Sequence, residues 1–392
     1  MKILMISSYL PYPLFDGGSV RLYNLMRELQ KEHAITLICE QRVHQGRAEK
    51  EAVEKICKKV ITVPRRKQWS IPNLLKTGLS GDSFLIVGHT LPQMKKAIEE
   101  ELKAEEYDLI HIETSYVMQN LPRTKLPIVL VEHNIEYMVY EKFMNKAPLP
   151  LRLFLKIDIQ KLKKREEAFW HQATQVVTVS DVEKEVVEKT GIKAKTVYNG
   201  VDLETFKFKK SESEKDIKQF LFIGSYKWLQ NRDSVRWILQ DIWPKIRQNT
   251  SEKVVLRIVG RDMPRDIKNW KDDTVIIEEN SPRKAVDIFS ESFALLAPIR
   301  IGGGSQYKIL EAMAVGTPVL TTSLGLSGLD ISPDQDILVA DTAQGLVESA
   351  VQLLKDPKLS QSLRAHARKQ IEAKYDWSAI AKTLGSVYQS VV

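Results

Sequence analysis

The feature that most constrains the fold is a series of short apolar segments that alternates with helical patterns, twice over. The first round contains six strand candidates: Lys2–Ser7, Ala34–Cys39, Val60–Val63, Leu109–His111, Ile128–Glu132 and Val176–Ser180. The second round contains six more: Phe220–Ile223, Val254–Val259, Val275–Ile277, Phe293–Ala297, Val319–Thr322 and Ile337–Val339. Short apolar runs separated by helices are typical of parallel sheets that are covered on both faces. The sequence therefore predicts two doubly wound α/β domains.

The boundary between these domains is expected near residues 203–218, where the stretch FKFKKSESEKDIK is polar and charged, as a linker or exposed turn should be. We therefore predict a first domain over residues 1–205 and a second over residues 206–374. The last stretch, Tyr375–Val392, has a helical pattern and could pack on either domain. A chain of 392 residues is also too long for one compact core.

Composition excludes several protein classes. The apolar run at the N-terminus breaks at Pro11, so it is too short for a signal peptide or a membrane span. Cys39 and Cys57 are the two cysteines, too few for a disulfide framework, and a cytoplasmic protein is expected. No metal is predicted, because Asp334 and Asp336 lie in a polar turn without a third ligand nearby.

The net charge of +8 is concentrated between Lys142 and Arg165, where eight Lys or Arg face a single acid, Asp158. Apolar residues such as Leu153 and Phe154 are interleaved with them. Two interpretations stay open for this stretch: a solvated helix face, or a surface that meets anionic lipid head groups. Nucleic acid is not an expected partner, because no recognised nucleic-acid motif accompanies the charge.

Two glycines follow the first strand. Gly17 and Gly18 lead into a helix whose apolar residues share one face, and Ser19 is a candidate to cap that helix. Glycines between a strand and a helix let backbone N–H groups approach phosphate. A plain strand-to-helix turn explains them equally, since the G-x-G-x-x-G fingerprint of dinucleotide-binding proteins is absent.

Polar residues also follow the strand Ile128–Glu132, in the order His133, Asn134, Ile135, Glu136. The carboxyl end of a parallel strand faces the crevice where α/β folds bind ligands. His133 could donate a hydrogen bond or act as an acid or base near neutral pH. The alternative is a histidine that caps a turn.

The second domain opens with a similar pattern, since Gly224 ends a strand and Lys227 follows in the loop. Arg300 and Lys308 flank the glycines 302–304 after another strand. Two loops that carry cations at strand ends of one sheet could converge on a diphosphate, which Arg binds through its fork and Lys as a point charge. The helix Tyr307–Val315 would add free N–H groups and the positive end of its dipole. A simple turn explains the glycines but not the cations.

Together these segments resemble a known family. DGGSVRLYNLMREL, VEHNIEY, VVTVS, VYNGVD and GGGSQYKILEAMAVGTPVLTT stand in the order seen in glycosyltransferase family 4, and the resemblance covers nearly the whole chain. FIGSYKWLQNRDSVRWILQDIWPKI resembles a branch common among bacterial polysaccharide and cell-envelope transferases. The resemblance implies the GT-B fold, with two Rossmann-like domains that face a central cleft. It assigns nucleotide-sugar binding to the second domain, acceptor binding to the first, and residues 375–392 to the first.

Roles for individual residues follow from the resemblance. Catalytic roles are implied for His133, which would touch the donor sugar, and for Lys227, Arg300 and Lys308, which would neutralise the leaving diphosphate. The implied donor-binding positions are Gly17, Gly18, Gly224, Arg261, Asn280, Gly303, Gly304, Ser305, Gln306 and Glu311. Of these, Glu311 would accept hydrogen bonds from the ribose, while Arg261 and Asn280 would line the base pocket. Asn134 and Glu136 would face the acceptor.

Two positions depart from the family pattern. The family often has two Glu separated by seven residues, but only Glu311 is present, with Gly303 in the earlier position. The usual Arg and Lys after the first strand of the second domain are replaced by Ser225 and Gln230. Lys227, Arg300 and Lys308 are the candidates to take over that charge.

The resemblance implies a retaining, metal-independent hexosyltransferase. It would move a sugar from a UDP- or GDP-sugar to the hydroxyl of a glycan or lipid-linked glycan, in polysaccharide, glycolipid or cell-envelope synthesis. The nucleotide sugar is the substrate, and no cofactor is expected. The leaving phosphate itself would take the acceptor proton. A nucleotide-sugar epimerase and a non-catalytic nucleotide-sugar-binding subunit stay as alternatives. A cytoplasmic enzyme is expected, and a peripheral position on the inner face of the plasma membrane would follow from the lipid-binding interpretation of Lys142–Arg165. No oligomeric state is predicted.

Overall fold

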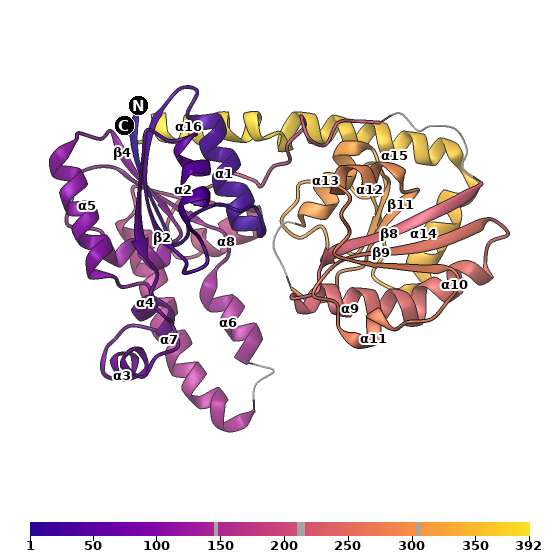
Figure 1. Ribbon diagram of the computed structural model, residues 1–392, viewed down its shortest axis with the longest axis horizontal. Coiled ribbons are helices and arrows are strands. Elements are labelled where there is room, and N and C mark those ends of the chain that lie inside the picture. The colour runs from indigo at the N-terminus through magenta and orange to yellow at the C-terminus, as the bar shows by residue number, and fades with distance from the viewer. Residues whose placement is uncertain (145–147, 210–215, 303–305) are drawn as a thin grey trace. The chain divides into compact units, whose positions relative to one another are not determined.

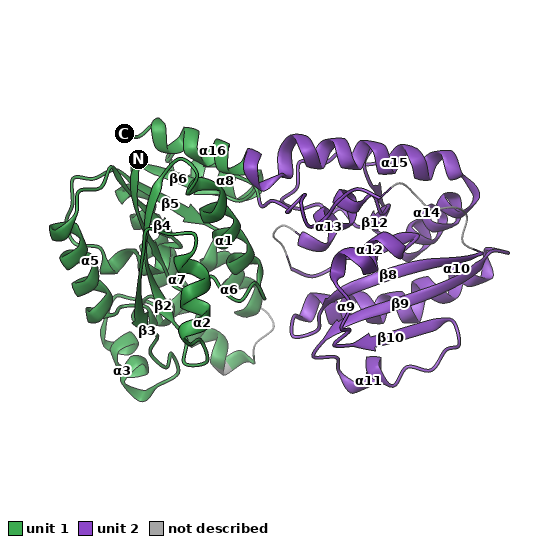
Figure 2. Ribbon diagram, turned by 45° about the horizontal axis from the view of Figure 1, so that its top comes forward, with its two compact units in different colours: residues 1–198, 380–392 green, residues 199–379 purple. Residues whose placement is uncertain are grey.

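The computed structural model describes residues 1–144, 148–209, 216–302 and 306–392. The chain forms two compact units (Figure 2): Met1–Tyr198 with Ile380–Val392, and Asn199–Ala379. Each unit is built around one parallel sheet with helices on its faces (Figure 1). None of the helices in the described part of the chain combines the length and the apolar character that a membrane span needs.

The sheet of the first unit has seven parallel strands in the order β3-β2-β1-β4-β5-β6-β7. They are β1 (Lys2–Ser7), β2 (Ala34–Gln41), β3 (Lys59–Pro64), β4 (Leu109–Glu113), β5 (Ile128–Glu132), β6 (Gln175–Thr178) and β7 (Ala194–Thr196). The helices are α1 (Gly17–Leu29), α2 (Arg47–Glu54), α3 (Ile71–Leu79), α4 (Phe84–Gly88), α5 (Pro92–Ala104), the 3₁₀ helix η1 (Ser115–Asn120), α6 (Glu136–Met144), α7 (Leu149–Gln172) and α8 (Asp181–Glu188). The final helix, α16 (Trp377–Gln389), enters this unit at Ile380.

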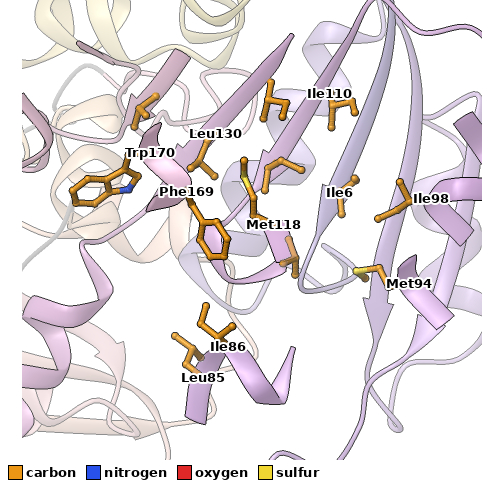
Figure 3. Close-up of a cluster of buried hydrophobic side chains, with 14 of the residues drawn as sticks. Ile6, Leu85, Ile86, Met94, Ile98, Ile110, Met118, Leu130, Phe169 and Trp170 are labelled. Carbon is orange, nitrogen blue, oxygen red and sulfur yellow. The ribbon is translucent and has the colours of Figure 1, made fainter. Parts of the chain in front are cut away.

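Alternation along the strands divides the core of the first unit into two layers. Leu4 and Ile6 of β1 belong to a cluster that packs against α4, α5 and the C-terminal half of α7, part of which is shown in Figure 3. Ile3 and Met5 are equally buried and point to the opposite face, because successive side chains of a strand alternate. Buried on both faces, the strands read as continuous apolar runs, which is why the sequence shows them clearly.

The second unit repeats the plan with six parallel strands in the order β10-β9-β8-β11-β12-β13. They are β8 (Ile217–Ser225), β9 (Lys253–Arg261), β10 (Val275–Glu279), β11 (Ala294–Ala297), β12 (Val319–Thr321) and β13 (Leu338–Val339). Its helices are α9 (Leu229–Trp237), the π-helical turn η2 (Ile238–Ile242), α10 (Trp243–Gln248), α11 (Arg265–Lys268), α12 (Ala285–Glu291), α13 (Tyr307–Val315), α14 (Ala343–Lys355), α15 (Pro357–Gln370) and a second π-helical turn, η3 (Ile371–Tyr375).

Local details differ from the sequence analysis at one helix start and at one strand end. Ser19 does not cap α1: the helix begins at Gly17, and the carboxylate of Asp16 accepts the N–H of Ser19 at 2.9 Å. Ser180 does not end β6, which stops at Thr178, but caps α8 by accepting the N–H of Glu183. The short strand β7 was not predicted, since three residues of which one is exposed give little apolar signal. The pair Asp334 and Asp336 lies in a turn.

Strand order places a switch point in each sheet. In the first unit the chain reverses its direction of winding between β1 and β4, and in the second between β8 and β11. Ligands of doubly wound sheets bind outside the carboxyl ends of the strands at such points. Candidate site residues are therefore those that follow β1, β4 and β5 in the first unit, and β8 and β11 in the second.

Candidate functional site

In the second unit, the starts of two helices, α13 and α9, meet beside the end of β8. Lys308, in the first turn of α13, extends its ammonium to Oδ1 of Asn231 on α9, at 2.6 Å. The same ammonium stands 4.5 Å from the ring centroid of Phe222. A Cβ added to Gly224 would come within 3.2 Å of Lys308 Nζ, so glycine leaves the space that this lysine uses. The structure thus brings the lysine that follows β11 to the end of β8 and the start of α9, within one unit.

Glu311 lies one helical turn beyond Lys308 on α13. Burial lowers the pKa of Lys308 to about 7, and the charge of Glu311 offsets part of that effect. Burial also raises the pKa of Glu311 to about 7, against the opposing effect of Lys308. Both side chains therefore change charge near neutral pH, and a bound anion would favour the ammonium form of Lys308.

Arg300 follows β11 but has a different environment. Its Nε and Nη2 donate to the two carboxylate oxygens of Asp233 on α9, at 3.1 and 3.0 Å. The guanidinium also lies 4.3 Å from the ring centroid of Trp237. Its bidentate fork is therefore engaged by a carboxylate. Lys227 lies exposed in the loop after β8.

The ends of β8, β9 and β10 carry the residues expected around the nucleotide base. Ser225 on β8 pairs in register with Arg261 on β9, which is exposed. Asn280 follows β10, and its N–H donates to the carbonyl of Gly260 at 2.8 Å. Gly260 has no room for a side chain, because a Cβ would lie 1.9 Å from the carbonyl oxygen of Gly224. Arg261 and Asn280 thus lie at the same edge of the sheet.

The glycine-rich turn is described only in part. Gly303, Gly304 and Ser305 lie outside the described residues. Gln306 is buried and precedes the first residue of α13. At its other end α13 stops at Gly316, whose φ of 83° is a left-handed conformation that suits glycine.

In the first unit, Gly17 and Gly18 form the start of α1. A Cβ on Gly18 would lie 3.0 Å from the hydroxyl of Tyr9, which is buried and without a hydrogen-bond partner in the described part of the chain. Asn134 and Glu136 follow His133 and are both half-buried. The N–H of Glu136 donates to Glu166 Oε1 at 2.8 Å, so a carboxylate from α7 caps the start of α6. Burial raises the pKa of Glu136 to about 7.

His133 lies directly after β5 and is hydrogen-bonded to a buried glutamate. Its Nε2 is 2.5 Å from Oε1 of Glu113, the last residue of β4, while Nε2 of His111 is 2.8 Å from Oε2 of the same carboxylate. Burial acts to raise the pKa of Glu113, but His133 and His111 together hold it well below its usual range. Glu113 is therefore a carboxylate although it is fully buried.

Two family models match the chain. The model for Glycosyltransferase Family 4 matches residues 15–205, and the model for Glycosyl transferases group 1 matches residues 217–356. The chain belongs to glycosyltransferase family 4. The matches fall on the two units separately, so each unit has its own counterpart in the family. The predicted α/β architecture is confirmed as the GT-B fold.

Individual proteins are similar to the chain in sequence or in fold. The chain is 25% identical over 334 residues, 76% of each chain, to a Bacillus subtilis (strain 168) protein named "Putative glycosyltransferase YtcC". It is 22% identical over 392 residues, 96% of each chain, to an uncharacterized 44.6 kDa protein in the cps region of Klebsiella pneumoniae. HepE of Anabaena, solved in complex with UDP, aligns over all of both chains with a TM-score of 0.63 at 14% identity, a likeness of fold.

Sequence reasoning missed several residues of this family 4 glycosyltransferase. Glu113 and His111 were not singled out, although they end a strand just as His133 follows one. Asn231 and Asp233 were also missed, because a polar residue inside a helix gives no signal until its partner is known. The argument from strand ends that found His133 would have found Glu113, had the strand been extended beyond His111.

Proposed function

We propose that the chain is a retaining glycosyltransferase that moves a hexose from a UDP- or GDP-sugar to an acceptor hydroxyl in the synthesis of bacterial polysaccharide or cell-envelope glycan. The observation that carries this proposal is the meeting of Lys308 and Asn231 beside the end of β8, with Glu311 one turn further on. A family 4 enzyme needs a cation where its leaving diphosphate gains charge. The Klebsiella relative, from a cps region, supports the polysaccharide context.

The residues divide the work as follows. Lys308 would bind the diphosphate and stabilise the charge that grows as the bond between the sugar carbon and the phosphate oxygen breaks. Glu311 would accept the ribose hydroxyls, and His133 would touch the donor sugar. The acceptor oxygen bonds to the sugar carbon, and its proton passes to the leaving phosphate oxygen. Arg300 would join only by leaving Asp233, while Lys227 is exposed in the loop.

The acceptor is proposed to be lipid-linked, at an anionic membrane surface. The first half of α7 exposes apolar side chains between its basic ones, and 70% of Leu153 and 74% of Phe154 are accessible. Lys161 ties α7 to the end of α3 by donating to the carbonyls of Thr77 and Ser80, both at 2.7 Å. The neighbouring α3 also exposes apolar residues, including Leu79. Basic and apolar side chains on one surface suit anionic lipid.

The test is a thermal-shift screen of nucleotide sugars, because a bound donor raises the apparent stability of the folded chain. The best donor is then incubated with the protein alone and with glycan or lipid-linked acceptors. Transfer only in the presence of an acceptor is expected. A change of the sugar without any acceptor would identify an epimerase instead, and binding without turnover on any acceptor would indicate a binding subunit.

A further inference from the structure

A chain of buried polar groups runs through the first unit and ends at His133. The hydroxyl of Tyr388, on α16, lies 2.7 Å from Nδ1 of His111. His111 Nε2 lies 2.8 Å from Glu113, and Glu113 lies 2.5 Å from His133 Nε2. Tyr388, His111 and Glu113 are at most 1% exposed, whereas 17% of the His133 side chain is accessible. The chain thus begins on the terminal helix and reaches solvent only at His133.

The direction of each hydrogen bond follows from the chemistry of the groups. A carboxylate can only accept, so both histidines donate to Glu113 from Nε2. His111 then accepts at Nδ1 when neutral, and the phenol of Tyr388 must be its donor. With its hydrogen on Nε2, the neutral ring of His133 has an acceptor at Nδ1, and that atom has no hydrogen-bond partner among the described residues. Whether the second ring nitrogen of a histidine carries hydrogen depends on the hydrogen bond that the first nitrogen makes.

Among the residues that the structure describes, two further polar residues lie near Glu113, but neither donates a hydrogen bond to it as the two histidines do. Arg21, on α1, forms a buried ion pair with Glu113, its Nε lying 3.9 Å from Oε1 and beyond hydrogen-bond distance, and its Nη1 donates to the carbonyl of Tyr198 at 2.8 Å. The hydroxyl of Tyr9, after β1, is buried, and its burial, followed by the charge of Glu113, raises the pKa of Tyr9. An apolar side chain in place of Glu113 would avoid the cost of burying a charge. A carboxylate kept there, at the switch point of the sheet, favours a functional role.

We propose that Glu113 is a positioning residue for the reaction: it holds the ring of His133 in the form that carries hydrogen on Nε2 and leaves Nδ1 as the atom that meets the ligand. His111 and Tyr388 orient Glu113 in turn. The identification of that ligand as the donor sugar rests on the proposed function. The tautomer of the His133 ring, in contrast, is a property of the free protein. A carboxylate that orients a histidine through one nitrogen is a known way to fix its tautomer.

The experiment records ¹⁵N NMR spectra of the histidine rings in the full chain at a pH where they are neutral, with His133→Asn used for assignment. The wild-type ring of His133 is expected as the Nε2–H tautomer. Glu113→Gln can donate as well as accept, so a mixture with the Nδ1–H tautomer is expected. Wild-type His133 as Nδ1–H, or an unchanged ring in Glu113→Gln, would overturn the proposal, and the wild-type spectrum decides it even where the variant fails to fold.

Kinetics supply the second readout. Glu113→Gln should lower kcat by about tenfold or more with little change in the donor KM, and Glu113→Asp should restore part of it. The matched control is Glu101→Gln, which alters a buried glutamate bonded to Lys59 and Tyr107 elsewhere in the unit. An equal loss in Glu101→Gln would make the effect structural and overturn the positioning role. Absence of transfer by the wild type would instead refute the proposed function, while the NMR result would still decide the state of the ring.

Discussion

The ammonium of Lys308 donates to Oδ1 of Asn231 at 2.6 Å, which joins the first turn of α13 to α9 beside the end of β8. Lysine and asparagine come from segments 77 residues apart, and the sequence gives no sign of their contact. Ser225, at the end of β8, and Gln230, on α9, stand where the family usually has an Arg and a Lys. We propose that Lys308 supplies, from α13, the charge that this family usually places after β8.

The first prediction concerns that lysine. Lys308→Met keeps the length of the side chain and removes its charge, so binding of the nucleoside diphosphate found in the thermal screen should weaken by about tenfold to a hundredfold, since a hydrogen bond to a charged group contributes roughly 1.5–3 kcal/mol. Isothermal titration measures the Kd. Lys245→Met, at an exposed lysine on α10, is the control and should bind like the wild type. Equal Kd values for both variants would remove Lys308 from the site.

The second prediction uses the ion pair between Arg300 and Asp233. If Arg300 must leave Asp233 to reach the diphosphate, Asp233→Asn should tighten binding by up to about fivefold, because an exposed ion pair contributes roughly 0.2–1 kcal/mol. Adding Arg300→Leu to Asp233→Asn should cancel the gain. Titrations of the two variants with the same diphosphate check this. Unchanged or weaker binding by Asp233→Asn would show that Arg300 serves only to hold α9.

The third prediction is a pH dependence. The pKa of Lys308 is lowered to about 7, so its ammonium form, which binds the anion, is lost as pH rises above about 7. Glu311 raises that pKa, and Glu311→Gln should therefore move the loss to lower pH. The ratio of the variant Kd to the wild-type Kd should grow between about pH 6 and pH 7.5. A ratio that stays constant over this range would mean that the lost ribose contact is the whole effect.

The sequence predicted the layers of this fold better than its polar contacts. The apolar runs from Lys2–Ser7 to Ile337–Val339 each overlap a strand, because a strand buried on both faces must be apolar along its length. His133 was predicted as a site residue by its place after β5. Its partner Glu113 depends on the pairing of β4 with β5, and Tyr388 lies 277 residues from His111. Such contacts depend on packing between distant segments, which no local pattern encodes.

The fourth prediction concerns stability. Burial raises the pKa of Glu132 from 4.5 to about 8, although Trp170 Nε1 donates to it at 2.8 Å. The folded state thus binds a proton that the unfolded state releases, so the free energy of unfolding should fall as pH rises from about 4.5 to about 8. Glu132→Gln keeps an acceptor for Trp170 and cannot ionise. Urea unfolding at several pH values should show that the free energy of unfolding falls less steeply with pH in the variant. At pH 8 the variant should be more stable than the wild type. Parallel curves would contradict a neutral Glu132.

The fifth prediction tests the exposed surface of α7. Phe154→Glu places a negative charge where 74% of the side chain is accessible, so the fold should persist while binding to anionic vesicles is lost. Co-sedimentation with phosphatidylglycerol vesicles should fall severalfold, and the wild type should bind less as salt increases. Ile217→Glu alters an exposed apolar residue of the second unit, 49% accessible, and should bind like the wild type. Equal sedimentation of all three proteins, or binding that ignores salt and lipid charge, would reduce α7 to a solvated helix face.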